Sequence, residues 1–264
     1  MKPYYKTNSC ALYQCDNLDL LKSLPDNYVD LIYCDILYNT GRKFKDYDDN
    51  LGTPQEAITW YEPRLIEMKR ILKETGTIYL HMDYRLVHYM KVKMDEIFGM
   101  ENFINDIAWC YTGPAATKSY YPRKHDNILF FSKSTDYIFN QPRIKHKSGV
   151  HNTGQVFGDM NIGSVEVKKN LEEKGKKLED WWIDIWSTDR YRKELCGYPT
   201  QKPKKLLERV IKASSNENDI VADFFMGSGT TGEVALELGR KFIGCDIGDK
   251  ACKISKERIE NIIK

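Results

Sequence analysis

The sequence predicts an α/β fold with a mostly parallel sheet covered by helices on both faces. Short apolar runs alternate with stretches of helical periodicity, as expected of successive strand–helix units. Carboxylates close several of the apolar runs, and ligands bind such sheets at the carboxyl ends of the strands. The length of 264 residues, of which 41% are hydrophobic and 30% charged, suits one large domain or one domain with an insertion.

Strand-like and helix-like segments follow one another in both parts of the chain. In the first part, strands are expected at 11–16, 29–34, 77–82, 103–111 and 127–132, and helices at 18–24, 54–73 and 84–98. Pro25, Gly76 and Gly99 follow these helices as stop signals. In the last part, helices are expected at 204–213, 231–238 and 250–263, and strands at 219–225 and 241–246.

The regular alternation stops after Ser134. Residues 135–196 are polar and rich in lysine, with a charged helix expected at 165–179, and this region is predicted to be an insertion. Residues 111–212 contain 20 Lys and Arg against 12 Asp and Glu, whereas the remainder contains 20 against 26. A basic middle favours an anionic partner, although charge alone is equally compatible with a solvated surface.

Composition excludes several classes of protein. No apolar run approaches the roughly 20 residues of a membrane helix, and the first residues lack the apolar core of a secretory signal. The seven cysteines are odd in number and include no C-x-x-C pair, so neither a zinc site nor a disulfide framework is expected. A protein without a metal in the reducing cytoplasm is therefore predicted.

One stretch combines an apolar strand with polar groups at its end. The run from Val29 to Cys34 is followed by Asp35, two apolar residues and Tyr38. A carboxylate at a strand end can accept hydrogen bonds, and an aromatic ring three residues later offers a flat face. These groups are suited to a planar, amine-bearing ligand.

A second stretch predicts a nucleoside-containing cofactor. Asp223 ends a predicted strand, and Gly227, Gly229 and Gly232 then form a G-x-G-x-x-G pattern that opens a helix. Glycines let the backbone turn tightly and approach a ligand closely. The next strand ends on Asp246, which could bind two ribose hydroxyls. The structural alternative is a tight turn followed by an unrelated acid.

The acids around this loop favour S-adenosylmethionine over a dinucleotide. The G-x-G-x-x-G pattern alone would also suit a nicotinamide dehydrogenase. However, Asp223 would repel a pyrophosphate and attract an ammonium or sulfonium group. Asp16, at the end of the first strand, could accept from an adenine amino group, and its structural alternative is a helix N-cap.

The order of these motifs resembles the β class of amino-group DNA methyltransferases. Asp35-x-x-Tyr38 comes first, a variable region follows, and Phe225-Met226-Gly227-Ser228-Gly229 comes last. Further matches are the stretches PTQKP at 199–203, ASSN at 213–216 and FIGCD at 242–246. The resemblance covers residues 10–134 and 197–264, about three quarters of the chain.

The resemblance implies a Rossmann-like, S-adenosylmethionine-dependent methyltransferase sheet with an inserted target-recognition region. Residues 1–134 would form the catalytic half, 135–196 the insertion and 197–264 the cofactor-binding half. The reaction would move a methyl group to an exocyclic amine of double-stranded DNA, with the target base flipped out of the duplex. Aspartate at position 35 is more similar to adenine-N6 enzymes than to cytosine-N4 enzymes, which remain the alternative.

The same resemblance implies residue roles. Asp35 and Tyr38 would be catalytic, together with Ile36 through its backbone carbonyl. The cofactor would be bound by Asp16, Lys202, Asp223, Phe225, Gly227, Gly229, Thr230, Thr231 and Asp246. DNA would be bound by Arg42, Lys43, Arg123, Lys124, His125, Arg190 and Arg192. A homodimer and a cognate restriction endonuclease are further partners that the resemblance allows.

The chain departs from the family at Ile36 and Leu37, where the family usually has two prolines. Proline fixes φ and restricts the residue before it, so the turn is expected to be looser here. We favour an active enzyme with a variant turn over a weak or inactive homologue that binds DNA and cofactor. Protein glutamine methylation is disfavoured, because the first motif residue is then typically asparagine. Trp181, Trp182 and Trp186 are expected in the core of a small subdomain, with base stacking as the alternative.

Overall fold

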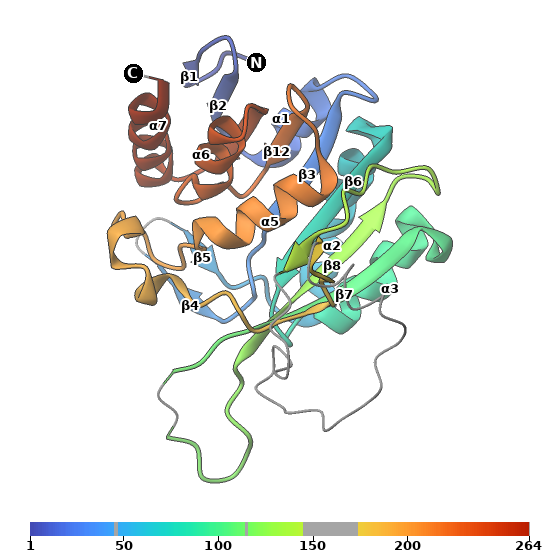
Figure 1. The fold of residues 1–264 in the computed structure, drawn as a ribbon, viewed down its shortest axis with the longest axis vertical. Coiled ribbons are helices and arrows are strands. Elements are labelled where there is room, and N and C mark those ends of the chain that lie inside the picture. Colours follow the sequence, from blue (N-terminus) through green and yellow to red (C-terminus); the bar gives the residue numbers. More distant parts are fainter. Residues whose placement is uncertain (45–46, 114–115, 145–173, 264) are drawn as a thin grey trace.

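A large mixed sheet forms the centre of the computed structural model, which describes residues 1–44, 47–113, 116–144 and 174–263 (Figure 1). Within these residues the main sheet has nine strands in the order β1-β2-β13-β12-β3-β6-β8-β7-β11. Their bounds are β1 Tyr5–Lys6, β2 Cys10–Gln14, β3 Val29–Asp35, β6 Leu72–Met82, β7 Phe103–Cys110, β8 His125–Ser132, β11 Trp181–Trp182, β12 Ile220–Asp223 and β13 Lys241–Asp246. Strands β2, β13, β12, β3 and β6 are parallel, whereas β8 is antiparallel to both of its neighbours, β6 and β7.

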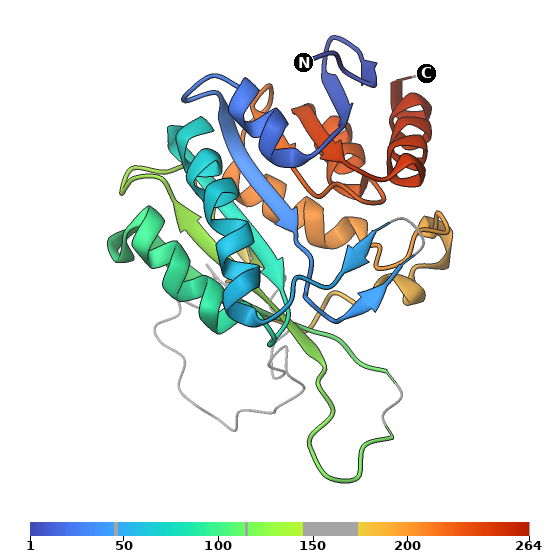
Figure 2. The ribbon, with the colours of Figure 1, turned by 180° about the vertical axis from the view of Figure 1, so that it is seen from behind.

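Helices cover both faces of this sheet. Their bounds are α1 Asn17–Ser23, α2 Pro54–Ile71, α3 Val87–Phe98, α5 Lys204–Ser214, α6 Thr230–Glu237 and α7 Asp249–Ile263, with short 3-10 helices η1 Met100–Asn102, η2 Thr188–Arg190 and η3 Arg192–Glu194. Helices α1, α2 and α3 share one apolar core, while α5, α6 and α7 share the core on the opposite face (Figure 2). The predicted α/β fold is confirmed.

The path of the chain diverges at the middle of the sheet. From β12 the chain continues through α6 to β13 on one side, and from β3 it continues through α2 to β6 on the other. Because β12 and β3 are neighbours, this is a topological switch point, where open α/β sheets bind ligands outside the strand ends. The carboxyl ends of β3 and β12 carry Asp35 and Asp223.

Some predicted boundaries shift for local reasons. The helix predicted at 54–73 ends at Ile71, because Leu72 has extended backbone angles and already pairs with Val29 of β3. The helix predicted at 84–98 begins at Val87, because residues 83–86 form a turn in which Leu86 and Val87 both donate to the carbonyl of Asp83.

The helix predicted at 165–179 lies outside the described residues up to position 173. At its described end the prediction is wrong, because Lys176–Lys177 forms strand β10, paired antiparallel with β9 at Arg143–Ile144. The tryptophans also differ from expectation. Trp182 lies in β11 of the main sheet, and the Arg209 guanidinium of α5 is 4.9 Å from its ring centre. Trp182 is therefore part of the main core and does not belong to the core of a separate subdomain.

Across the described ranges, no helix has both the length and the apolar character needed to cross a membrane.

Candidate active site

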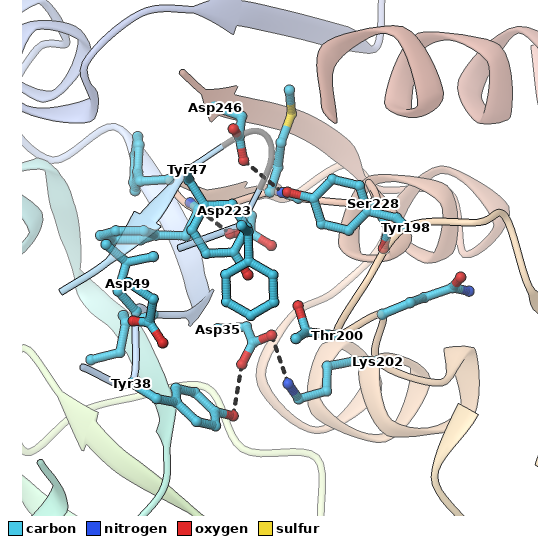
Figure 3. Close-up of a pocket in the computed structure, with 18 of the residues that line it drawn as sticks. Asp35, Tyr38, Tyr47, Asp49, Tyr198, Thr200, Lys202, Asp223, Ser228 and Asp246 are labelled. Atoms are coloured by element: carbon cyan, nitrogen blue, oxygen red, sulfur yellow. Dashed lines mark hydrogen bonds and ion pairs between the residues drawn. The ribbon is translucent and has the colours of Figure 1, made fainter. Parts of the chain in front are cut away.

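A cavity of about 860 Å³ lies at the carboxyl ends of β3, β12 and β13 (Figure 3). Three carboxylates from these strand ends line it, namely Asp35, Asp223 and Asp246. Tyr198 and Thr200, from the segment before α5, also line it. The structure thus brings the two motifs singled out in the sequence, about 190 residues apart, into one cavity.

Asp223 is a buried carboxylate beneath the glycine loop. It accepts hydrogen bonds from Thr231 Oγ1 at 2.6 Å and from the Phe225 backbone N at 3.0 Å. Burial raises the pKa of Asp223 to about 7. The negative charges of Asp35 and Asp246 also raise this pKa, whereas the two hydrogen bonds lower it. A cationic group placed in the cavity would offset this destabilisation of the ionised form.

Asp246 and two glycines shape the loop above Asp223. One Asp246 oxygen accepts from the Gly227 N at 2.9 Å and the other from the Gly248 N at 2.8 Å. Gly229 has φ +74°, and a Cβ there would come within 2.8 Å of the Ser255 backbone in α7, so only glycine fits. Thr230, the first residue of α6, also lines the cavity.

Asp16 has structural partners within the cavity wall. It caps α1 by accepting from the Leu18 N at 2.8 Å, and both its oxygens accept from Arg64 Nη2 at 3.0 Å. Arg64 is buried and lies 3.4 Å from the Trp60 ring centre. The N-cap interpretation is therefore correct, and Asp16 still lines the cavity. Phe225 packs beside Trp60, with ring centres 6.3 Å apart.

Both carboxylate oxygens of Asp35 have partners. Lys202 Nζ lies 2.7 Å from Oδ2, and the Tyr38 hydroxyl donates to Oδ1 at 2.9 Å (Figure 3). Lys202, which the resemblance assigned to the cofactor, thus contacts the carboxylate assigned to catalysis. Burial, together with the charges of Asp35 and Asp126, raises the pKa of Tyr38 well above its usual value, so its hydroxyl stays protonated.

A second carboxylate, Asp126 of β8, lies behind Tyr38. It accepts from Tyr38 at 3.2 Å and from Tyr111 at 3.0 Å, and His81 Nε2 lies 3.3 Å from it. Tyr33 in turn lies 2.7 Å from His81 Nδ1. Burial alone would raise the pKa of Asp126, but the hydrogen bond and charge of His81, with further help from Lys202 and Tyr111, lower it.

The turn at Ile36-Leu37 has a hydrogen bond that proline could not make. The Ile36 backbone N donates to the His81 carbonyl at 3.2 Å, which extends the pairing of β3 with β6 past Asp35. The Ile36 side chain is buried, and the Leu37 carbonyl accepts from the buried Tyr61 at 3.0 Å. The turn expected to be loose is therefore held by backbone pairing and core packing.

Introducing proline at position 36 is expected to destabilise the protein. Ile36→Pro removes the donor to His81 and part of the buried side chain, which should lower the free energy of unfolding by about 1–3 kcal/mol. Urea unfolding of this variant and of Leu37→Pro, the matched control with a half-buried side chain, measures the difference. Equal stability of Ile36→Pro and the wild type would contradict this account of the turn.

The basic residues assigned to DNA lie in three segments around the carboxyl ends of the strands (Figure 1). Arg42 and Lys43 form β4, which pairs with β5 (Asp48–Asp49), and Arg42 also lines the cavity. Arg190 and Arg192 lie in η2 and η3 before α5, with the Arg190 guanidinium 5.5 Å from the Trp186 ring centre.

The third basic segment consists of the two residues before β8 and the first residue of that strand. Arg123 lies between two aromatic rings, 4.2 Å from the centre of Tyr84 and 5.0 Å from that of Tyr120, and it donates to the Tyr84 hydroxyl at 3.0 Å. Lys124 follows, and its carbonyl accepts a hydrogen bond from the Tyr111 backbone N at 2.9 Å. His125 is the exposed first residue of β8.

The fold matches solved DNA methyltransferases. The structure titled M1.HpyAVI–SAM complex has a TM-score of 0.61 at 21% identity, covering 94% of this chain and 99% of that one. The cytosine-N4-specific PvuII DNA methyltransferase has a TM-score of 0.64 at 20% identity, covering 99% of this chain and 93% of that one. The sheet and its cavity therefore define a methyltransferase fold.

Sequence comparison identifies the family. A family model, N6_N4_Mtase, described as a DNA methylase, matches residues 29–257, and the chain belongs to this family. The type II methyltransferase M.HpaI of Haemophilus parainfluenzae is 35% identical over 94% of this chain and 73% of its own length. The DNA adenine methyltransferase YhdJ of Escherichia coli K12 is 32% identical over 93% of this chain and 81% of its own length. The resemblance to amino-group DNA methyltransferases is confirmed, and a nicotinamide dehydrogenase is rejected.

Proposed function

We propose that this chain transfers the methyl group of S-adenosylmethionine to the N6 amine of adenine in DNA. The observation that carries the proposal is the shared cavity, which holds Asp35 at one strand end and Asp223 and Asp246 at the neighbouring ones. Two features favour adenine over cytosine: aspartate as the first motif residue, and the relation to an enzyme named as a DNA adenine methyltransferase.

The cavity residues fit the cofactor. The buried carboxylate of Asp223 would face its ammonium group, and Asp246 would accept from its ribose hydroxyls. Phe225, beside Trp60, would supply apolar contact, and Thr230 and Thr231 lie at the start of α6 next to the loop. When bound, the cofactor supplies an electrophilic methyl group.

Asp35 would orient the amine for attack. The lone pair of an aromatic amine is delocalised into its ring. Asp35 and the Ile36 carbonyl would accept hydrogen bonds from the two N–H groups of the amine. These hydrogen bonds would draw the nitrogen towards tetrahedral geometry and direct its lone pair at the methyl group. Tyr38 would stack on the base. Holding the two reactants in line then contributes a large part of the rate.

DNA would approach the carboxyl edge of the sheet. The assigned residues Arg42, Lys43, Arg123, Lys124, His125, Arg190 and Arg192 would contact phosphates and base edges there. The target base must leave the duplex to reach Asp35, because the Asp35 side chain lines the cavity and is only 20% exposed. We place the reaction in the cytoplasm, since all seven cysteines are free thiols.

Transfer of labelled methyl groups to mixed-sequence duplex DNA tests the proposal. Nucleoside analysis of the product should show N6-methyladenine, and Asp35→Ala should form it at least about 100-fold more slowly. N4-methylcytosine would overturn the choice of base. Cofactor binding without transfer to any duplex would favour the inactive homologue, which should still bind DNA with steep salt dependence. The homodimer and the cognate restriction endonuclease stay predictions, to be checked by sedimentation and by sequencing the host genome and its methylated adenines.

A further inference from the structure

The hydroxyl of Tyr38 lies between two carboxylates and can bind either one. It is 2.9 Å from Asp35 Oδ1 and 3.2 Å from Asp126 Oδ2. A protonated tyrosine has a single O–H donor, so the two carboxylates compete for it. Rotation of the hydroxyl hydrogen alone exchanges the acceptor, without movement of the ring.

Substrate binding favours this exchange. In the structure both oxygens of Asp35 are occupied, one by Lys202 and one by Tyr38. An incoming amine must also donate to Asp35, so it competes with these two donors for the lone pairs of the carboxylate. Release of a donor in a buried site is costly unless the donor finds another acceptor.

Asp126 is built to be that acceptor. Tyr111, the residue after β7, and His81 of β6 hold its two oxygens, so its position does not depend on Tyr38. Its side chain is buried, and Tyr33 lies against His81 Nδ1, so Nε2 donates to Asp126 both from the imidazolium and from the neutral tautomer whose Nδ1 accepts from Tyr33. The network therefore presents a fixed acceptor at the back of Tyr38.

We propose that Asp126 is a positioning residue that takes the Tyr38 hydroxyl from Asp35 when the target amine binds. This inference rests on the proposed function and deepens it. The proton stays on Tyr38 throughout, and no bond to carbon or nitrogen changes. The exchange frees Asp35 Oδ1 for the amine and keeps the Tyr38 ring in place for stacking on the base.

A double-mutant cycle of Asp126→Asn and Tyr38→Phe tests the proposal. Asp126→Asn leaves one uncharged acceptor oxygen for the three donors Tyr38, Tyr111 and His81. In the wild-type background it should therefore lower the single-turnover methylation rate by about 10-fold to 100-fold, the range for a hydrogen bond to a charged group. In the Tyr38→Phe background there is no hydroxyl to remove from Asp35, so Asp126→Asn should change the rate by less than about 2-fold. Asp106→Asn, an exposed acid of β7, is the matched control and should stay near the wild-type rate.

A merely structural role of Asp126 would give a different result. If Asp126 only supported His81 and Tyr111, its substitution would lower the methylation rate by the same factor in both backgrounds, and this outcome would overturn the proposal. An unchanged rate in both backgrounds would overturn it as well. The cycle is repeated on the affinity for adenosine with the cofactor site saturated by S-adenosylhomocysteine. This second measurement works without methyl transfer, so failure of the proposed function and failure of the exchange are distinguishable.

Discussion

Replacement of Asp35 by alanine is expected to lower the methyl-transfer rate by at least about 100-fold to 1,000-fold, the cost of removing a group that stabilises developing charge. Asp35 is the carboxylate that ends β3 within the cavity, and both its oxygens bind donors there. Without it, the amine loses its acceptor and its lone pair is no longer directed at the methyl group. Single-turnover assays with labelled cofactor measure the loss.

Cofactor binding separates a catalytic loss from a folding defect. Asp35→Ala leaves the ammonium of Lys202 without this partner, so unfolding and cofactor titration must be measured beside activity. Asp35→Asn is the sharper variant, because its amide keeps the size of the carboxylate and can still accept from Tyr38. A rate near that of the wild type for Asp35→Asn, with the cofactor bound, would contradict the assigned role of the charge.

The residues at strand ends were predictable because their signals are local. Asp35, Asp223 and Asp246 each end an apolar run, and adjacent strand ends of a parallel sheet share an edge. The long-range contacts of the site residues were not predictable. Lys202 and Asp35 are 167 positions apart, and Tyr38 and Asp126 are 88 positions apart, so only the tertiary fold reveals these contacts.

Three other features were not predicted from the sequence, each for a different reason. Strand β11 has two residues, too few for any periodicity, and it is a strand only because β7 lies beside it. At Ile36, loss of proline suggests a looser turn, but the same change restores a backbone donor that pairs with His81. Arg64 was also missed, because it lies at one position of a long helical pattern and its partner Asp16 is on another element.

Replacement of Asp223 by asparagine is expected to weaken S-adenosylmethionine binding by about 100-fold or more, because removing one member of a buried ion pair costs about 3–5 kcal/mol. Asp223 is 2% exposed, so little water is available to replace the lost charge. Isothermal titration measures the affinity. Asp219→Asn, a more exposed acid just before β12, is the matched control and should bind normally.

Because the pKa of Asp223 is raised, both the stability of the protein and its affinity for the cofactor should depend on pH. At about 7, the pKa lies above the ordinary value of 3.8, so the folded protein without cofactor keeps a proton that the unfolded chain has lost. Its stability should therefore fall as pH rises from about 4 to 7, on the order of 4 kcal/mol in total, and Asp223→Asn should not show this loss. Cofactor affinity of the wild type should instead rise over pH 5.5–7.5, because the ammonium binds the ionised carboxylate.

The stability of the cofactor-free protein should fall with pH while its cofactor affinity rises, and both changes have the same cause, ionisation of Asp223. A buried carboxylate that destabilises the empty protein at neutral pH is retained only where a cation compensates it. Asp223→Asn should thus be more stable than the wild type at pH 8 without cofactor, and it should gain less stability than the wild type when cofactor is added. Thermal unfolding of both proteins with and without S-adenosylmethionine tests the pair of expectations. A variant that loses stability at pH 8 and keeps its affinity would show that Asp223 serves packing and not the ammonium.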